Sequence, residues 1–423
     1  MKNTFIIIII FINFKFIFSQ ENNHFKDFKI KISGFVSYDA WYHTRQYVSA
    51  RDGLVSLYPK NIELDKNGDD INEDGYLNAV SMKSRIRFDM KEIEILNGKT
   101  SAILEGDFTG TENSNANGFR IRHAYVKMFW ENKNLEISFG QRYHPFFILE
   151  AIPNVMALHT GVPIQLLNRT PQLRITKKYK NFTIMMSAIT QRDFKSPGPL
   201  KKDEIKYSSE FLQNAKIPNL NLRFHFNFKN TVFGVATDYK ILKPRLKTTI
   251  NDEDFFKTNE KIKSFSFASF FKTKIGKNFT LKTKIIYSQN LFEHLTLGGY
   301  AISSIDKKTG KETYTPTNHF NIWTNIVYEK NYRFSIYGGF LKNLGTTDDI
   351  IENSIFYARG ENIDNLYKIT SHISKKINKF QIAFETERTT VSYGKIDFEN
   401  KGKIKNTKAV TDYRFLFVVM YFF

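Results

Sequence analysis

The chain ends in the stretch TDYRFLFVVMYFF, residues 411–423, in which every residue from Phe415 onward is apolar. Successive side chains of a β-strand point to opposite faces, so residues two apart share a face. One face of such a strand would be apolar throughout, and we expect it to contact lipid: Ala409, Tyr413, Phe415, Phe417, Val419, Tyr421 and Phe423. The last strand of a soluble β-sandwich is the alternative interpretation.

The same alternation recurs along the chain, whereas helical periodicity is hard to find. Segments 219–228, 278–289, 333–340 and 379–387 all alternate between apolar and polar residues. In segment 28–43, FKIKISGFVSYDAWYH, the apolar face carries Phe28, Ile30, Ile32, Val36, Tyr38, Ala40 and Tyr42. This pattern indicates β-strands of about 9–12 residues, each with one apolar and one polar face.

Short polar turns alternate with long polar stretches, which is the layout of an outer-membrane barrel. Seven short turns pair fourteen strands, and segments 28–43 and 408–423 complete sixteen. The turns are EILNGK (94–99), ENKN (131–134), KYKN (178–181), FKN (228–230), IGKN (275–278), EKN (329–331) and KINK (376–379). The long stretches are 44–75, 191–219, 240–261, 290–318, 342–362 and 391–407. We therefore predict an all-β, antiparallel transmembrane barrel with short periplasmic turns and long extracellular loops.

The amino terminus predicts export. MKNTFIIIIIFINFKFIFSQ has a basic head and an apolar run that is too short for a membrane helix, so we expect a signal peptide cleaved near Ser19. The expected organisation is a signal peptide (1–19), a short segment (20–27) and a barrel (28–423). The absence of cysteine excludes disulfides and thiol chemistry.

The net charge of +20 from 62 Lys+Arg and 42 Asp+Glu could indicate a nucleic-acid partner. Richness in Ile, Lys, Asn, Phe and Tyr is also typical of an AT-rich genome, so we expect no nucleic-acid partner.

Charged residues of a transmembrane strand should face the lumen, because Lys or Arg at the lipid-facing midplane costs about 2–4 kcal/mol. Such charges are densest in the first third of the chain, where a basic ladder lies beside an acidic pair. We expect this arrangement to produce a transverse field that selects ions. Ion pairs that only brace the wall are the alternative. The expected pore-lining residues are Lys83, Arg85, Arg87, Glu105, Asp107, Arg120, Arg122, Arg142 and Arg174, whereas Met82 should face lipid.

Residues 143–170, YHPFFILEAIPNVMALHTGVPIQLLNRT, form an unusually apolar loop, the third on the outward side. Folding into the barrel would bury its Phe and Leu residues and narrow the pore. Packing over the mouth or against a neighbouring subunit is the alternative.

The run FRIRHAYVKMFW…ISFGQRYHPFF…GVPIQLLNRTPQLRI, within residues 80–176, resembles the porin-like outer-membrane proteins of the Bacteroidetes. More loosely, it is similar to general trimeric diffusion porins. This resemblance implies a passive channel that assembles as a homotrimer, with the third loop as its constriction. It also implies that the terminal Phe423 is recognised by the barrel-insertion machinery.

Other motifs are weak. Asp65, Asn67 and Asp69 have calcium-loop spacing, but the glycine and glutamate that complete such a loop are missing. The alternative interpretation is an acidic surface loop that binds no calcium. No GxSxG or HExxH motif occurs, and a phosphate loop is excluded at residues 97–101. We expect no cofactor and no enzymatic activity.

The predicted function is passive diffusion of small hydrophilic solutes across the outer membrane of a Gram-negative bacterium, with a modest anion preference. The alternatives are a substrate-specific channel for phosphate or dicarboxylates, a plugged structural or adhesive barrel, and an outer-membrane hydrolase.

Overall fold

The computed structural model describes residues 29–200, 204–251 and 254–423. The predicted signal peptide (1–19), the segment 20–27 and Phe28 lie outside these described residues.

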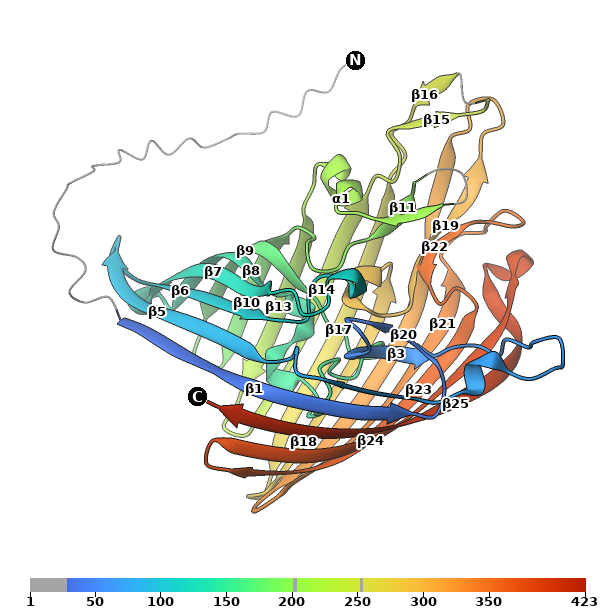
Figure 1. Ribbon diagram of the computed structural model, residues 1–423. Helices are drawn as coiled ribbons and strands as arrows, with labels where there is room; N and C mark the ends of the chain where they lie inside the picture. Colours follow the sequence, from blue (N-terminus) through green and yellow to red (C-terminus); the bar gives the residue numbers. More distant parts are fainter. Residues whose placement is uncertain (1–28, 201–203, 252–253) are drawn as a thin grey trace.

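Antiparallel pairing closes the chain into a sixteen-stranded barrel (Figure 1). Closure occurs where β1 pairs with β25, in a register that places Val36 opposite Tyr421 and His43 opposite Arg414. The second wall position is shared by two strands that both pair with β1, namely β4 and β5. In order around the wall, the strands are β1 (Lys29–His43), β4 (Tyr76–Val80) with β5 (Arg85–Ile95), β6 (Gly98–Asp107), β7 (Arg120–Trp130), β8 (Leu135–Tyr143), β9 (Arg169–Lys178), β10 (Phe182–Ile189), β13 (Asn219–Asn227), β14 (Thr231–Leu242), β17 (Ile262–Ile275), β18 (Phe279–Gln289), β20 (Glu312–Glu329), β21 (Arg333–Thr346), β23 (Ile363–Ile377), β24 (Phe380–Asp397) and β25 (Lys403–Phe422).

Smaller elements decorate the loops at the outer end. One hairpin belongs to loop 44–75, two others stand above the barrel, and one strand pair extends the sheet beside β20. No helix among the described residues is long and apolar enough to cross a membrane. The elements are β2 (Tyr47–Ala50), β3 (Val55–Pro59), β11 (Pro197–Pro199), β12 (Ile205–Tyr207), α1 (Glu210–Ala215), β15 (Lys247–Thr249), β16 (Phe255–Lys257), β19 (Gly298–Ile305) and β22 (Phe356–Arg359), with 3₁₀ turns at Ile71–Glu73, Asn113–Asn115, Glu131–Lys133, Pro145–Phe147, Leu149–Ala151, Phe292–His294 and Phe398–Asn400.

The predicted fold is confirmed, and each of the seven short turns joins two neighbouring wall strands. The predicted strand length of about 9–12 residues fits β13, β14 and β18 but is exceeded elsewhere, since β1 has 15 residues, β20 and β24 have 18 and β25 has 20. Stretch 391–407, expected as a long loop, is mostly strand, because the ladder between β24 and β25 continues up to Asp397 and Lys403.

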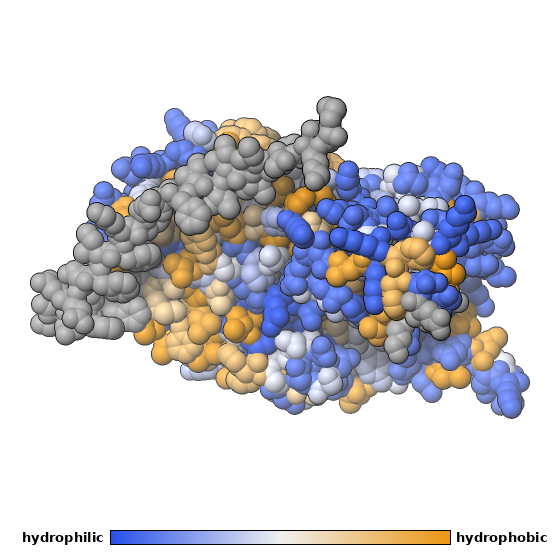
Figure 2. All heavy atoms as spheres, turned by 90° about the horizontal axis from the view of Figure 1, so that it is seen from above, coloured by the Kyte–Doolittle hydropathy of each residue, from blue (hydrophilic) through white to orange (hydrophobic). Residues whose placement is uncertain are grey.

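The lipid-facing pattern of the terminal strands agrees with the sequence. In β25, exposed Tyr413, Phe415, Phe417 and Tyr421 alternate with buried residues that face inward. Figure 2 shows apolar side chains gathered toward the end with the short turns, and mostly hydrophilic ones toward the end with the long loops. Met82 was expected to face lipid, which is wrong. It is buried near Trp41 because the wall strand is interrupted between β4 and β5 and its side chain turns inward.

Candidate functional site

Residues 143–170, hereafter loop 3, lie inside the barrel. Loop residues Phe146, Phe147, Val162, Ile164 and Leu166 are at most 1% exposed. Inward-facing side chains of β18, β20, β21 and β23 bind the loop through its polar atoms. These contacts run from Lys284 to the Phe146 carbonyl, from Trp323 to Gln165 (3.0 Å), from Tyr337 to the Gly161 carbonyl (3.2 Å) and from Lys368 to the Val162 carbonyl (3.0 Å). The apolar composition of this loop therefore reflects burial against the wall.

The tip of loop 3 is attached to two buried carboxylates of β24. The amide of Met156 donates to Glu385 (2.5 Å), and His159 Nε2 lies 3.4 Å from Glu387. Arg414 of β25 binds Glu385 at 2.8 Å. Burial lowers the pKa of His159 to about 3, and the nearby Glu387 only partly opposes this effect. His159 is therefore neutral at physiological pH.

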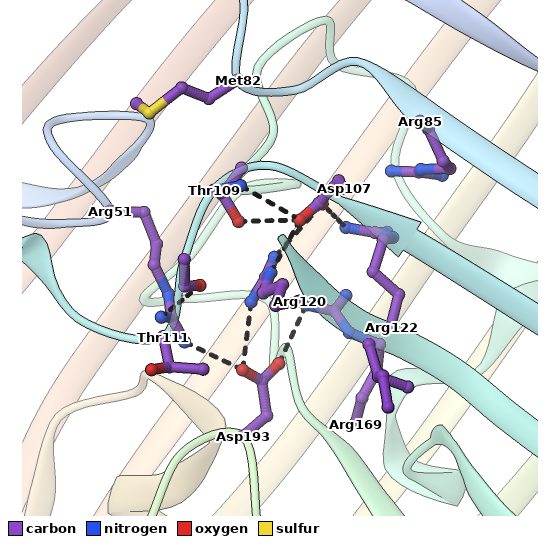
Figure 3. Close-up of polar contacts among 12 residues, drawn as sticks. Arg51, Met82, Arg85, Asp107, Thr109, Thr111, Arg120, Arg122, Arg169 and Asp193 are labelled. Carbon is purple, nitrogen blue, oxygen red and sulfur yellow. Dashed lines mark hydrogen bonds and ion pairs between the residues drawn. The ribbon is translucent and has the colours of Figure 1, made fainter. Parts of the chain in front are cut away.

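Elsewhere in the lumen, Asp107 and Glu105 of β6 hold arginines of β7, and Figure 3 shows the contacts of Asp107. Asp107 accepts from Arg120 Nε (2.8 Å) and Arg122 Nη1 (2.7 Å). Glu105 accepts from Arg122 Nε at 2.9 Å and lies 3.5 Å from Arg85. These side chains alternate with lipid-facing ones along each strand, which is why they all meet in the lumen. The basic and acidic groups therefore touch one another on the same wall.

A third carboxylate, Asp193, reaches this cluster from the loop between β10 and β11. It lies 2.8 Å from Arg51, 3.0 Å from Arg120 and 2.9 Å from Arg169. Burial would raise the pKa of Asp193, but the guanidinium groups of Arg169, Arg120 and Arg51 together hold it below its ordinary value. Burial lowers the pKa of Arg51 to about 10, so both partners stay charged at neutral pH.

A cavity of about 320 Å³ lies between loop 3 and this basic wall. Part of its lining is apolar and includes Val155, Leu158 and Phe194. The rest is strongly basic, and none of the described residues that line the cavity is Asp or Glu. The basic lining residues are Arg51, Lys83, Arg85, Arg120, Arg122, Arg169 and Arg333.

Six of the nine residues that the sequence singled out line the cavity or bind its arginines. Lys83, Arg85, Arg120 and Arg122 line the cavity, while Glu105 and Asp107 bind its arginines. The other three, Arg87, Arg142 and Arg174, do not line it. Arg87 pairs with Asp89 (2.8 Å) and also reaches Glu105 of the cluster (3.2 Å), whereas Arg142 contacts Glu136 (3.4 Å) and Arg174 binds Gln172 (2.6 Å).

The sequence did not reveal Arg51, Arg169 or Asp193 as part of this cluster. Arg51 and Asp193 lie in loops, where no alternation signals the direction of a side chain. Arg169 opens β9 directly after loop 3, and its place in NRTPQLRI was the one available signal.

The calcium-loop residues form a tight turn. The Asp65 carboxylate accepts from the amides of Asn67 (2.8 Å) and Asp69 (2.9 Å). These amides, that of Asp69 first, lower the pKa of Asp65. Among the described residues, no group of three or more His, Cys, Asp or Glu side chains is placed to hold a metal ion. Calcium binding here stays a prediction.

Comparison with known proteins finds similarity in structure alone. No protein-family model matches the sequence, and no curated protein is similar to it in sequence. The outer-membrane channel DcaP of Acinetobacter baumannii matches with a TM-score of 0.66 and 16% identity, over 94% of this chain and 97% of that chain. The fold is that of the outer-membrane porins. OmpT of Vibrio cholerae matches with a TM-score of 0.54 and 8% identity, over 94% of this chain and 98% of that one. An anion-selective porin from Comamonas acidovorans matches with a TM-score of 0.52 and 8% identity, over 94% and 100%.

Proposed function

We propose that this chain is a porin of the Gram-negative outer membrane that lets small hydrophilic solutes diffuse, with a preference for anions. The observation that carries the proposal is the basic cavity beside loop 3. A low-dielectric cleft lined by charges of one sign attracts the opposite ion over several ångströms. Selection would come from this field and requires no covalent chemistry. A porin of similar fold is described as anion-selective, which agrees with this preference.

The charges of the basic wall leave an excess of two positive groups. Six basic side chains meet four carboxylates, so at full ionisation two positive charges are uncompensated. Arg85 has the weakest partner, because it lies 3.5 Å from Glu105, which Arg122 binds at 2.9 Å. The six are Arg51, Lys83, Arg85, Arg120, Arg122 and Arg169, and the four are Asp39, Glu105, Asp107 and Asp193.

The partners proposed for this porin follow from its apolar outer surface and from its resemblance to known porins. Outer-membrane lipid would cover the apolar face, and the insertion machinery would recognise Phe423. A homotrimer is proposed because OmpT, which has a similar fold, is described in a trimer form. A relation to the porin-like proteins of the Bacteroidetes is proposed from the run within residues 80–176.

Two narrower functions have observations of their own. Arg85 and Arg169 each have a buried Nε that lacks a hydrogen-bond partner among the described residues, as a binding site for phosphate or dicarboxylates would require. A plugged barrel is supported by the apolar cluster that joins Leu57 and Tyr58 of loop 44–75 to Phe147 and Val162 of loop 3.

The experiment is single-channel recording of the refolded protein in a planar bilayer under a KCl gradient. We expect stable conductance and a reversal potential on the chloride side. Arg85→Gln should move this potential toward the cation side, because it removes one positive charge from the cavity. The wall should stay intact, because Glu105 keeps Arg122 as its partner. Lys330→Glu, in an exposed periplasmic turn, is the control. No conductance from a folded barrel would favour the plugged barrel, and an unchanged potential in Arg85→Gln would contradict the anion preference.

A further inference from the structure

Asp193 differs from the other carboxylates of the basic cluster because it does not belong to the barrel wall. It projects from a short loop segment, residues 190–196, between β10 and β11. Its side chain is only 4% exposed and lies among Arg51, Arg120 and Arg169 (Figure 3). These three arginines come from loop 44–75, from β7 and from β9, and all three line the cavity. A loop therefore places one carboxylate on three cavity arginines.

The three arginines surround this carboxylate as they would a bound ligand. Arg51 and Arg120 both donate to Oδ1, whereas Arg169 donates to Oδ2. Planar guanidinium groups match the geometry of a carboxylate and form its strongest hydrogen bonds in proteins. Arg120 is also held from behind by Asp107, and the Arg51 Nη1 is fixed by the Gly110 carbonyl (2.6 Å). Two of the three donors are thus fixed by contacts other than Asp193.

The segment that carries Asp193 is anchored at both ends. The Thr190 amide donates to the Pro171 carbonyl (3.0 Å), and the Gln191 side chain binds Ser196 through its hydroxyl (2.8 Å) and its amide (3.1 Å). Between these anchors, Asp193 and Phe194 extend over Arg51, whose guanidinium lies 5.0 Å from the Phe194 ring. Phe194 also packs against the apolar cluster that includes Phe147, so release of the carboxylate would require only the Asp193 side chain to turn away from the arginines.

We propose that Arg51, Arg120 and Arg169 form a binding site for the carboxylate group of a passing solute, and that Asp193 occupies this site as a built-in competitor when no solute is present. The inference rests on the proposed channel function and names the recognition site within it. A solute carboxylate would replace Asp193 on the three arginines, so the loop would both screen the site and set its affinity. Without Asp193 the site gains one net positive charge and an empty position.

The test uses acetate as the probe, because acetate has the chemistry of the missing side chain. Asp193→Ala should create a site that acetate fills, and millimolar potassium acetate should reduce its chloride current more strongly than that of the unmodified protein. Asp193→Asn keeps the shape and removes the charge, and it should raise the chloride-to-potassium permeability ratio several-fold. Asp349→Ala and Asp349→Asn, at an exposed loop position, are the matched controls.

Failure of the site is distinguishable from failure of the channel. If Asp193→Ala responds to acetate no more than Asp349→Ala does, the three arginines are not a carboxylate site. If no variant conducts, the proposed channel function fails, and acetate binding is then read from heat unfolding of the folded barrel. Acetate should raise the unfolding temperature of Asp193→Ala but not of the unmodified protein, because a ligand stabilises the state that binds it. Equal shifts in both proteins would overturn the proposal.

Discussion

Replacing Glu387 by Gln should destabilise the barrel strongly, because this carboxylate is the centre of the contact between loop 3 and the wall. Glu387 lies 2.9 Å from Lys368 Nζ, 3.4 Å from His159 Nε2 and 3.8 Å from Arg414 Nη2. All four side chains are at most 4% exposed. An amide keeps the shape but leaves Lys368 without its carboxylate, and breaking a buried ion pair in this way costs about 3–5 kcal/mol.

The stability loss expected for the buried Glu387–Lys368 pair is larger than that for an ion pair on the surface. Glu329 and Arg333 form an exposed ion pair at 2.6 Å, for which about 0–1 kcal/mol is expected. Glu329→Gln is therefore the matched control for Glu387→Gln. The assay is guanidinium unfolding of the refolded barrel in detergent, followed by tryptophan fluorescence. Trp323 is 1% exposed and bonded to Gln165 of loop 3, so it reports on the loop contact.

A double-mutant cycle tests whether the effect comes from the unpaired charge. Lys368→Met alone should also destabilise, since it leaves Glu387 with longer contacts. The free energy of unfolding should fall less in the double variant than the sum of the decreases in the two single variants, because the double variant removes both charges together. Two results would contradict this reasoning: the same denaturation midpoint in Glu387→Gln and Glu329→Gln, or additive decreases in unfolding free energy in the double variant. Either would mean that the ion pair does not hold loop 3.

Three further predictions concern the loop and the chain terminus. Deleting residues 421–423 should abolish membrane assembly, and normal insertion in a cell-fractionation assay would contradict the role given to the tail. Gly161→Ala should lower the free energy of unfolding by about 1–3 kcal/mol, because Gly161 has φ +91° and a Cβ would lie 3.0 Å from the Tyr337 ring; an unchanged denaturation midpoint would disprove it. The pKa of His159 falls from 6.5 in the unfolded chain to about 3, so the unfolded state binds the proton first and stability should decrease as pH falls from about 6.5 to 3. His159→Gln should remove this part of the pH dependence in denaturation curves, and an unaltered slope would count against it.

The sequence predicted the barrel because the bilayer enforces one rule on every strand. Apolar residues must alternate with polar ones. The alternation alone therefore predicted that Phe415, Phe417 and Tyr421 face lipid, with no knowledge of the strands beside them. Met82 was misplaced because the wall strand is interrupted there, and alternation cannot be extended across such a break. The long ends of β24 and β25 were missed for a related reason, since outside the membrane two strands can stay paired without an apolar face.

Only part of the site was predicted, because the face of a strand on which a side chain lies does not reveal which other side chain it contacts. Alternation placed Arg120, Arg122 and Asp107 in the lumen, and their strands are neighbours in sequence, so their contact could be expected. Nothing local connects His159 with Glu387, which lies more than 200 residues further along the chain. That contact depends on how a loop crosses a closed barrel, and the hydrophobicity of loop 3 indicates burial but not the side on which the loop is held.

Two neighbouring parts of the barrel wall, which meet where β1 pairs with β25, differ in their charge balance. Beside the tip of loop 3, Lys368 and Arg414 face Glu385 and Glu387 while His159 stays neutral, and the buried Asp412 of β25 adds a third carboxylate that binds His43 (2.7 Å). The basic wall, which begins at β1 beside β25, has six basic groups against four carboxylates. Within each cluster the nearest opposite charges neutralise each other, so the transverse field expected from the sequence stays a prediction. Under the proposed function, this excess of two positive charges in a low-dielectric lumen attracts mobile anions to the cavity between loop 3 and the basic wall.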